Sequence, residues 1–365
     1  MTAIAIVGCG VIAPAYAQTF AELGFVDLVA CADAIPERAA ALAAAHDIPR
    51  ATTLDDVLAD PTIDCIVNLT PPLAHTAVSD AALRAGKSVF SEKPLGVDLD
   101  EGRALVALAA DLGLRLGCAP DTFLGAGLQT CRAVIADGFI GEPIAANAFF
   151  LGSGPESWHP HPDIFYRRGA GPMFDMGPYY LTTLVQLLGP ARAVSAAARI
   201  THAERTIGSE PRRGERIPVE VPTHVSSAIE FASGAIATVV TSFDVQASRY
   251  RNIEIYGTEA TLSVPDPNYF EGPVRVRALG DTEWREIPPR PSALPARRGI
   301  GAADMLWAIG SGRAHRASGD LALHVLEMMT ASFASAERGE RIALTTDCMP
   351  AELIPTGLPL HTFDD

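Results

Sequence analysis

The stretch Ala3-Ile4-Ala5-Ile6-Val7-Gly8-Cys9-Gly10-Val11-Ile12-Ala13 decides the fold of this chain. The apolar run up to Val7 predicts a buried strand, and the apolar periodicity from Ala13 to Leu23 predicts a helix. Backbone N–H groups at a helix N-terminus can hold a pyrophosphate, and a glycine at position 10 lets the backbone approach it closely. We therefore expect a dinucleotide site at Gly8, Gly10, Val11 and Ile12, with a tight turn that binds nothing as the alternative.

The second predicted strand, 28–32, ends at an acidic residue, Asp33. An acid at this point accepts hydrogen bonds from the adenosine ribose hydroxyls and repels a 2′-phosphate, so Asp33 favours NAD over NADP. An alanine-rich helix follows over 36–45, and its Arg38 is a further candidate contact to the cofactor that leaves NADP open.

Strands and helices continue to alternate along the first third of the chain. Strands are expected at 65–69, 88–90 and 114–118, and helices at 73–85 and 98–112. Such alternation predicts an α/β fold with a parallel, doubly wound sheet, and we place this Rossmann-type domain at 1–122.

In the second predicted domain, 123–365, the regular alternation of strands and helices gives way to strand-like runs joined by hairpin signals. Hairpin signals at 232–234 and 257–259 indicate a mostly antiparallel sheet, with helices on one face. Segments rich in Arg, Pro and Glu predict exposed loops at 204–220 and 287–299, and two helices at 302–312 and 320–337 are expected to close this domain.

Composition excludes several classes of function. The 365 residues are 48% hydrophobic, which suits two buried cores, and the formal net charge of −15 disfavours nucleic acid and anionic membrane surfaces as partners. No apolar run reaches the length of a membrane span and the N-terminus has no signal-peptide pattern, so we expect a cytoplasmic protein. The six cysteines lack metal-ligand spacing, and no metal is predicted.

Lysine is rare in this chain, because 26 of the 28 basic residues are Arg and the remaining two are Lys87 and Lys93. Arg cannot give up its proton at usable pH, whereas a lysine amine can. Lys87 follows a predicted helix C-terminus, where a cation is favourable. Lys93 has no such explanation and is a candidate for proton chemistry.

A second group of candidates follows two predicted strands. Thr70-Pro71 and His75 come after one strand, and Glu92-Lys93-Pro94 comes after the next. Ligands of parallel sheets bind outside the carboxyl ends of the strands, so we expect these residues at the nicotinamide side of the cofactor.

These motifs, together with Gly171-Pro-Met-Phe-Asp175-Met-Gly177-Pro-Tyr179, resemble the Gfo/Idh/MocA oxidoreductases, named for glucose–fructose oxidoreductase and inositol dehydrogenase. The resemblance covers nearly the whole chain. It implies that Lys93 hydrogen-bonds the reacting hydroxyl and the nicotinamide ribose, that Glu92 belongs to the cofactor site, and that Asp175 orients the substrate.

Tyr179 stands where many members of that family have a catalytic histidine. In having tyrosine at this position, the chain resembles the branch of the family that contains glucose–fructose oxidoreductase and the dihydrodiol dehydrogenases. Tyr has an unperturbed pKa near 10, so as a base it needs a nearby cation, for which Lys93 is the candidate. Asp175 and Tyr179 are expected on one face of a helix; alternatively, Asp175 caps that helix and Tyr179 is simply packed.

Substrate contacts are expected from a loop rich in aromatic and polar groups and from the domain junction. The two histidines at 159 and 161 have no further clustered ligand, which is more typical of substrate contact than of a metal site. The candidates for substrate binding, besides Lys93, Asp175 and Tyr179, are Asp121, Phe123, Trp158, His159 and Tyr166.

We interpret the chain as an NAD-dependent dehydrogenase that oxidises a hydroxyl of a monosaccharide, polyol or glycoside, with Lys93, Asp175 and Tyr179 as the catalytic residues. Three alternatives stay open. One is a redox-cycling enzyme that holds NAD tightly and forms a 3-keto glycoside, and another is an enzyme that oxidises a non-sugar diol. The third is a non-catalytic protein that senses NAD or sugar. A homo-oligomer, dimer or tetramer, is expected from the family resemblance.

Overall fold

The computed structural model describes residues 1–250 and 252–364, which fall into two compact units. The first unit combines Met1–Ala126 with Arg290–Leu323 and the described part of 351–365, and the second combines Gly127–Pro289 with His324–Pro350. Each unit has its own sheet, and each is described separately below.

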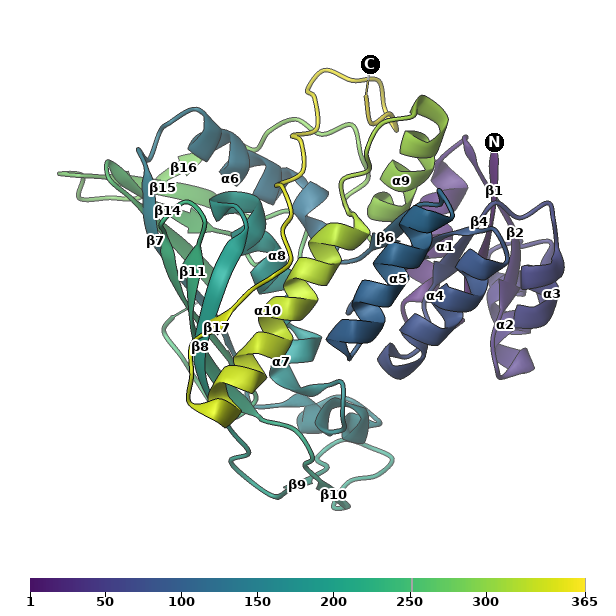
Figure 1. Ribbon diagram of the computed structural model, residues 1–365, viewed down its shortest axis with the longest axis horizontal. Coiled ribbons are helices and arrows are strands. Elements are labelled where there is room, and N and C mark those ends of the chain that lie inside the picture. The colour runs from purple at the N-terminus through teal and green to yellow at the C-terminus, as the bar shows by residue number, and fades with distance from the viewer. Residues whose placement is uncertain (251, 365) are drawn as a thin grey trace. The chain divides into compact units, whose positions relative to one another are not determined.

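The first unit is built on a parallel sheet with the strand order β3-β2-β1-β4-β5-β6 (Figure 1). This is the order of a dinucleotide-binding fold, in which the direction of winding reverses between β1 and β4. The strands are β1 (Thr2–Val7), β2 (Val26–Ala32), β3 (Arg50–Thr52), β4 (Cys65–Asn68), β5 (Ser88–Ser91) and β6 (Leu116–Cys118). The helices are α1 (Ala13–Glu22), α2 (Pro36–Ala45), α3 (Leu54–Ala59), α4 (His75–Arg84), α5 (Leu99–Asp111) and α9 (Ile300–Ser311).

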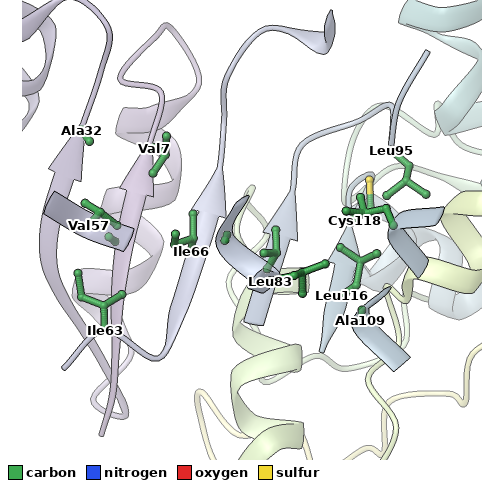
Figure 2. Packing of buried hydrophobic residues seen from close by; sticks show 14 of the residues in the cluster. Val7, Ala32, Val57, Ile63, Ile66, Leu83, Leu95, Ala109, Leu116 and Cys118 are labelled. Carbon is green, nitrogen blue, oxygen red and sulfur yellow. The ribbon is translucent and has the colours of Figure 1, made fainter. Parts of the chain in front are cut away.

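Helices cover both faces of this sheet, as neighbouring residues of β5 show. Val89 belongs to a buried cluster with Leu83 of α4 and Leu105 of α5, part of which Figure 2 shows. Phe90 lies on the opposite face, where a Cβ added to Gly301 of α9 would come within 2.9 Å of its ring. The predicted doubly wound parallel sheet is thus confirmed.

The second unit is built on a mixed sheet with the order β16-β15-β14-β13-β7-β12-β11-β8-β17, antiparallel at every described pair except β7 with β12. Its strands are β7 (Pro143–Leu151), β8 (Ala191–Arg199), β11 (His224–Phe231), β12 (Ile236–Ser242), β13 (Asn252–Gly257), β14 (Ala260–Val264), β15 (Val274–Ala278), β16 (Arg285–Ile287) and β17 (Ile342–Ala343). The expected mostly antiparallel sheet is confirmed.

Helices α8 (Gly177–Leu188) and α10 (Gly319–Arg338) pack on one face of this sheet. Tyr180 of α8 contacts Phe150 of β7 edge to face, and Ser227 of β11 hydrogen-bonds Ser332 of α10. On β12 the buried residues alternate with exposed ones such as Ile236, so the opposite face is open over this strand. The remaining helices associated with this part of the chain are α6 (Ala126–Ala136) and α7 (Gly171–Asp175).

The structure differs from the predicted domain boundaries, because the region after residue 122 is not one continuous domain. Segment 290–323 belongs to the first unit, where Asp121 accepts hydrogen bonds from the backbone N–H groups of Gly299 and Gly301. Phe363 is fully buried there against Phe25 and Trp307. Local sequence patterns do not reveal these contacts, because the partners are far apart in the sequence.

The segment 204–220 also differs from the predicted exposed loop. It contains the short hairpin of β9 (Glu204–Thr206) and β10 (Arg216–Pro218). Three of its apolar side chains are buried in a cluster with Phe243: Ile207, Ile217 and Val219. These few apolar positions could not be recognised as a buried pattern, because most residues around them in the sequence are charged or polar.

Candidate active site

The glycine turn after β1 is shaped by two glycines that serve different purposes. Gly8 has φ +98°, and a Cβ there would lie 2.5 Å from the backbone carbonyl of Leu69, so the fold itself requires this glycine. Gly10 has no positive φ, and a Cβ there would meet nothing within 4 Å. No side chain caps the N-terminus of α1, and Val11 in the turn is fully exposed. The turn therefore offers an open helix N-terminus to a pyrophosphate.

Asp33 holds this turn from the end of β2. Its Oδ2 accepts the backbone N–H of Cys9 at 2.7 Å, and its Oδ1 accepts that of Ile35 at 2.8 Å. Each carboxylate oxygen has a second lone pair, so Asp33 can still accept hydrogen bonds from ribose hydroxyls. Arg38 lies exposed in α2, where its predicted contact to the cofactor stays a prediction.

Apolar side chains are exposed in the loops after three neighbouring strands. Val11 follows β1, Ile35 follows β2 and Leu73 follows β4, with 100%, 42% and 62% of their surface exposed. Carboxyl ends of parallel strands meet at one edge of the sheet, so these loops share the edge at which a flat apolar ring of a dinucleotide would bind.

The loop after β4 is fixed by buried polar groups. Asn68 donates to the carbonyl of His75 and to Ser79, both at 3.0 Å, and its Oδ1 accepts from the hydroxyl of Thr70 at 2.7 Å. Thr70 is half-buried and Pro71 is exposed, as a contact to a ligand requires.

His75 is buried, which the sequence did not indicate. Its Nδ1 lies 2.7 Å from the carbonyl oxygen of Pro94 and its Nε2 2.7 Å from that of Thr70, so the ring links the loops after β4 and β5. Burial lowers its pKa, against the opposing effect of the two carbonyls. Its described contacts are to the protein backbone, and its predicted contact to the cofactor stays a prediction.

Glu92 and Lys93 follow β5 at the same sheet edge. One oxygen of Glu92 accepts the hydroxyl of Tyr16 at 2.9 Å, and the other accepts the backbone N–H of Lys93 at 2.9 Å. Tyr16 was missed from the sequence, because a tyrosine on the apolar face of a helix is indistinguishable from an ordinary core residue.

The two lysines have different roles. Lys87 is 3% exposed, and its amine donates to the carbonyls of Asp60 and Ile63, beyond the end of α3. It therefore stabilises the end of a neighbouring helix and not of the helix that precedes it. Lys93 is half-buried at the carboxyl end of β5.

Two predicted substrate contacts of the first unit are buried. Asp121 is 0% exposed and accepts from the start of α9, and burial is the main cause that raises its pKa. Phe123 is 1% exposed. Both residues support the fold as the structure shows them, which differs from the expected role in substrate binding.

In the second unit, Asp175 and Tyr179 lie on two successive helices. Asp175 is the last residue of α7, and α8 begins at Gly177 after Met176, without a side-chain cap. The expectation of one shared helix and the alternative of an Asp175 cap are therefore both wrong, because Met176 is the residue that ends α7 and caps the start of α8. Tyr179 is 6% exposed and Asp175 half-buried, and their catalytic roles stay predictions.

The loop before α7 presents aromatic side chains. Trp158 is 66% exposed and contacts His159 and Phe165 edge to face. The N–H of His161 donates to Nδ1 of His159 at 3.0 Å, so a neutral His159 carries its proton on Nε2. Burial lowers the pKa of His159, with Asp175 among the charged groups close enough to oppose this shift.

Tyr166 is 0% exposed and packs against Phe243 beneath the guanidinium of Arg205, so it differs from the expected substrate contact. Arg205 also pairs with Glu156 at 3.2 Å and with Asp244. These buried charges hold the loop that carries Trp158 and His159.

Within residues 1–250 and 252–364, no three or more His, Cys, Asp or Glu side chains are grouped so that they could hold a metal ion. In the same part of the chain, no helix is long and apolar enough to cross a membrane.

Comparisons with known proteins agree with this geometry. Residues 2–119 match the model of an oxidoreductase family with an NAD-binding Rossmann fold, and residues 128–263 match the GFO/IDH/MocA C-terminal domain. The chain is therefore an NAD-binding oxidoreductase by class. It belongs to the GFO/IDH/MocA family.

Curated relatives include 1,5-anhydro-D-fructose reductase of Ensifer adhaerens, 31% identical over 62% of this chain and 64% of the relative. Inositol 2-dehydrogenase of Rhizobium meliloti (strain 1021) is 26% identical over 76% of this chain and 78% of the relative. Among solved structures, levoglucosan dehydrogenase in complex with NADH and L-sorbose has a TM-score of 0.82 at 22% identity, covering 95% of this chain and 99% of that one. This last similarity shows the fold.

Proposed function

We propose that the protein is an NAD-dependent dehydrogenase that oxidises a secondary or anomeric hydroxyl of a monosaccharide, polyol or glycoside. One observation carries the proposal. In a chain with two lysines, Lys87 is committed to backbone carbonyls, whereas Lys93 follows β5 at the ligand-binding edge of an NAD-binding sheet. The names of the relatives, which include sugar and polyol dehydrogenases, support the substrate class.

The residues of the first unit fit the cofactor. The open helix N-terminus beyond Gly10 suits a pyrophosphate, and Asp33 suits the adenosine ribose of NAD. When bound, the nicotinamide accepts the hydride that leaves the substrate carbon. Thr70, Pro71 and Glu92 are the proposed contacts on the nicotinamide side.

Proton transfer is assigned to the chain's own side chains. As the carbinol carbon loses hydride, the hydroxyl proton passes to Lys93 or Tyr179, and the C–O bond becomes a carbonyl. Asp175 orients the substrate hydroxyl. Trp158 supplies an exposed aromatic face for the apolar side of a sugar ring, and the Nε2–H of neutral His159 supplies a hydrogen-bond donor.

The proposal includes a homo-oligomeric, cytoplasmic protein. All six cysteines are free and buried, which supports a reducing compartment. Ile236, which is exposed on the open face of β12, supports contact with a second copy. Light scattering on the purified protein tests the oligomer.

The experiment that tests the proposed reaction follows NADH absorbance on a panel of aldoses, polyols and glycosides, with NAD and NADP in parallel. We expect NADH to accumulate with one sugar class. Lys93→Met and the charge-preserving Lys93→Arg are both expected to lose turnover while they still bind NADH. Full turnover in Lys93→Arg would overturn the proton-transfer role. Bound NAD without net NADH would point to the redox-cycling enzyme or to the sensor.

A further inference from the structure

A tyrosine on the helix after the glycine turn reaches the residue next to Lys93. Tyr16 of α1 is 0% exposed, and its hydroxyl donates to Oε1 of Glu92 at 2.9 Å across 76 residues of sequence. Oε2 of the same carboxylate accepts the backbone N–H of Lys93 at 2.9 Å. One carboxylate therefore links the helix that starts at the pyrophosphate turn to the backbone of Lys93.

The contact lies in a buried and charged environment. Glu92 is 9% exposed, and its carboxylate is close enough to act electrostatically on Tyr16, His75, Cys118 and Asp121. Arg298 is the cation that acts on both Tyr16 and Asp121, and Lys93 follows Glu92 in the chain. Burial, and next the charge of Glu92, raise the pKa of Tyr16 well above its usual value. The hydroxyl therefore stays protonated and remains a donor over the working pH range.

We propose that Tyr16 is a positioning residue that acts through Glu92 to fix Lys93 relative to the glycine turn. The inference rests on the proposed function, in which Lys93 takes part in proton transfer. A dinucleotide seated on the turn and the amine of Lys93 then keep a set separation, because α1, Glu92 and the Lys93 backbone are joined by two hydrogen bonds.

Removal of the hydroxyl has a defined physical effect. In Tyr16→Phe the ring still fills its site, but Oε1 of Glu92 loses its donor in a place with little access to water. A buried carboxylate oxygen that has lost its donor reorients. This movement disturbs the N–H of Lys93, because that group donates to the other oxygen of the same carboxylate.

The composition of the chain offers a direct readout. With Lys87 and Lys93 as the two lysines, protein labelled with [15N]lysine gives two backbone amide signals, and Lys93→Arg identifies the second by its loss. The Lys93 amide reports on Glu92, whereas the Lys87 amide donates to the carbonyl of Ala82 and serves as the internal reference.

In Tyr16→Phe, we expect the backbone amide signal of Lys93 to move, because the carboxylate that accepts from this amide loses its hydrogen bond from the tyrosine hydroxyl. We also expect kcat to fall about tenfold or more, as for a displaced catalytic group, with the Kd for NADH changed less than about threefold. The matched control is Tyr256→Phe, which removes a hydroxyl that donates to Glu254 at 2.8 Å in the sheet of the other unit and leaves both readouts unchanged.

An unchanged Lys93 signal in Tyr16→Phe would overturn the inference, as would an equal effect of Tyr256→Phe. If Tyr16→Phe does not fold, Glu92→Gln replaces it: the amide oxygen can still accept from Tyr16, but its NH2 group cannot accept from the Lys93 N–H. The signals need no substrate, so this test is separate from the proposed proton-transfer role of Lys93, which fails if Lys93→Arg keeps full turnover, and from the proposed dehydrogenase reaction, which fails if no sugar class yields NADH.

Discussion

The carboxylate of Asp33 accepts the backbone N–H of Cys9 at 2.7 Å, so the residue that directly follows β2 also fixes the middle of the glycine turn. The same carboxylate bonds Ile35 at the start of the following loop. The side chain that we propose to select the cofactor therefore also shapes the glycine turn.

We expect Asp33→Asn to weaken NAD binding about tenfold or more while leaving NADP binding no weaker, because the amide oxygen can still hold the turn but the charge that repels a 2′-phosphate is gone. Fluorescence titration with NADH and NADPH measures the two dissociation constants. Asp27→Asn, at an exposed position of β2, is the control. An unchanged ratio of the two constants would contradict the role of Asp33.

The two glycines of the turn predict opposite results for the same substitution. Gly8→Ala is expected to destabilise the fold, because its Cβ would meet the Leu69 carbonyl at 2.5 Å. Gly10→Ala is expected to keep the thermal midpoint and lose affinity for NADH, since a Cβ there has space in the protein and would obstruct the pyrophosphate. Thermal unfolding and NADH titration check both variants. Tight NADH binding by Gly10→Ala would place the pyrophosphate elsewhere.

A buried cluster of charged side chains joins Asp364, in the segment 351–364, to Arg313 and Arg316 of the same unit. Asp304 is 0% exposed and accepts from Arg316 at 2.5 Å and from Arg313 at 2.6 Å, and both arginines also pair with Asp364. Asp304→Asn is expected to lower the free energy of unfolding by about 3–5 kcal/mol, as measured in urea, because it removes the fully buried carboxylate charge that both guanidinium groups share. Arg84→Ala, which breaks an exposed pair with Asp80, should leave the urea midpoint unchanged.

Buried histidines predict how stability depends on pH. Burial is the first cause that lowers the pKa of His75, His315 and His324. Below about pH 6.5 the unfolded chain takes up protons that these folded side chains do not, so the free energy of unfolding falls as the pH drops. Urea unfolding at pH 7.5 and 5.5 measures the decrease.

His75→Gln offers a single-site check of this dependence. At pH 7.5 the substitution removes the contacts of His75 that join the two loops, which lowers the stability of the variant. At pH 5.5 the variant also lacks the His75 side chain, one of the groups through which the natural protein loses stability as the pH falls. We therefore expect the difference in stability between the natural protein and the variant to shrink as the pH falls. A difference that grows would show that the folded state holds His75 charged.

Much of the fold could be predicted from local pattern. The strand, glycine turn and helix at the start of the chain, the helix at 36–45 and the hairpins at 232–234 and 257–259 all lie where periodicity and turn residues placed them. The short β3 and α3 were missed, since three and six residues carry too little periodicity.

The burial of single side chains was harder to predict, because it depends on partners that are distant in sequence. Asp121 was expected in a pocket, yet its donors are the N–H groups of Gly299 and Gly301. Tyrosine is a residue type that often contacts sugars, but the ring of Tyr166 lies below the guanidinium of Arg205. Tyr16 showed no signal at all, since its partner Glu92 is on another strand-end loop. Residue type alone does not separate such structural polar groups from ligand contacts.

The partner of Asp121 at Gly299 lies 178 residues further along the chain. During synthesis on a ribosome, the six strands of the parallel sheet all emerge before this partner does. The emerging chain thus carries an acidic side chain that the finished unit buries, and Phe25 and Trp307 still lack the ring of Phe363. The first unit is thus assembled from segments that lie on both sides of 127–289 in the sequence, so a nascent chain can complete this unit only after 127–289 has been synthesised.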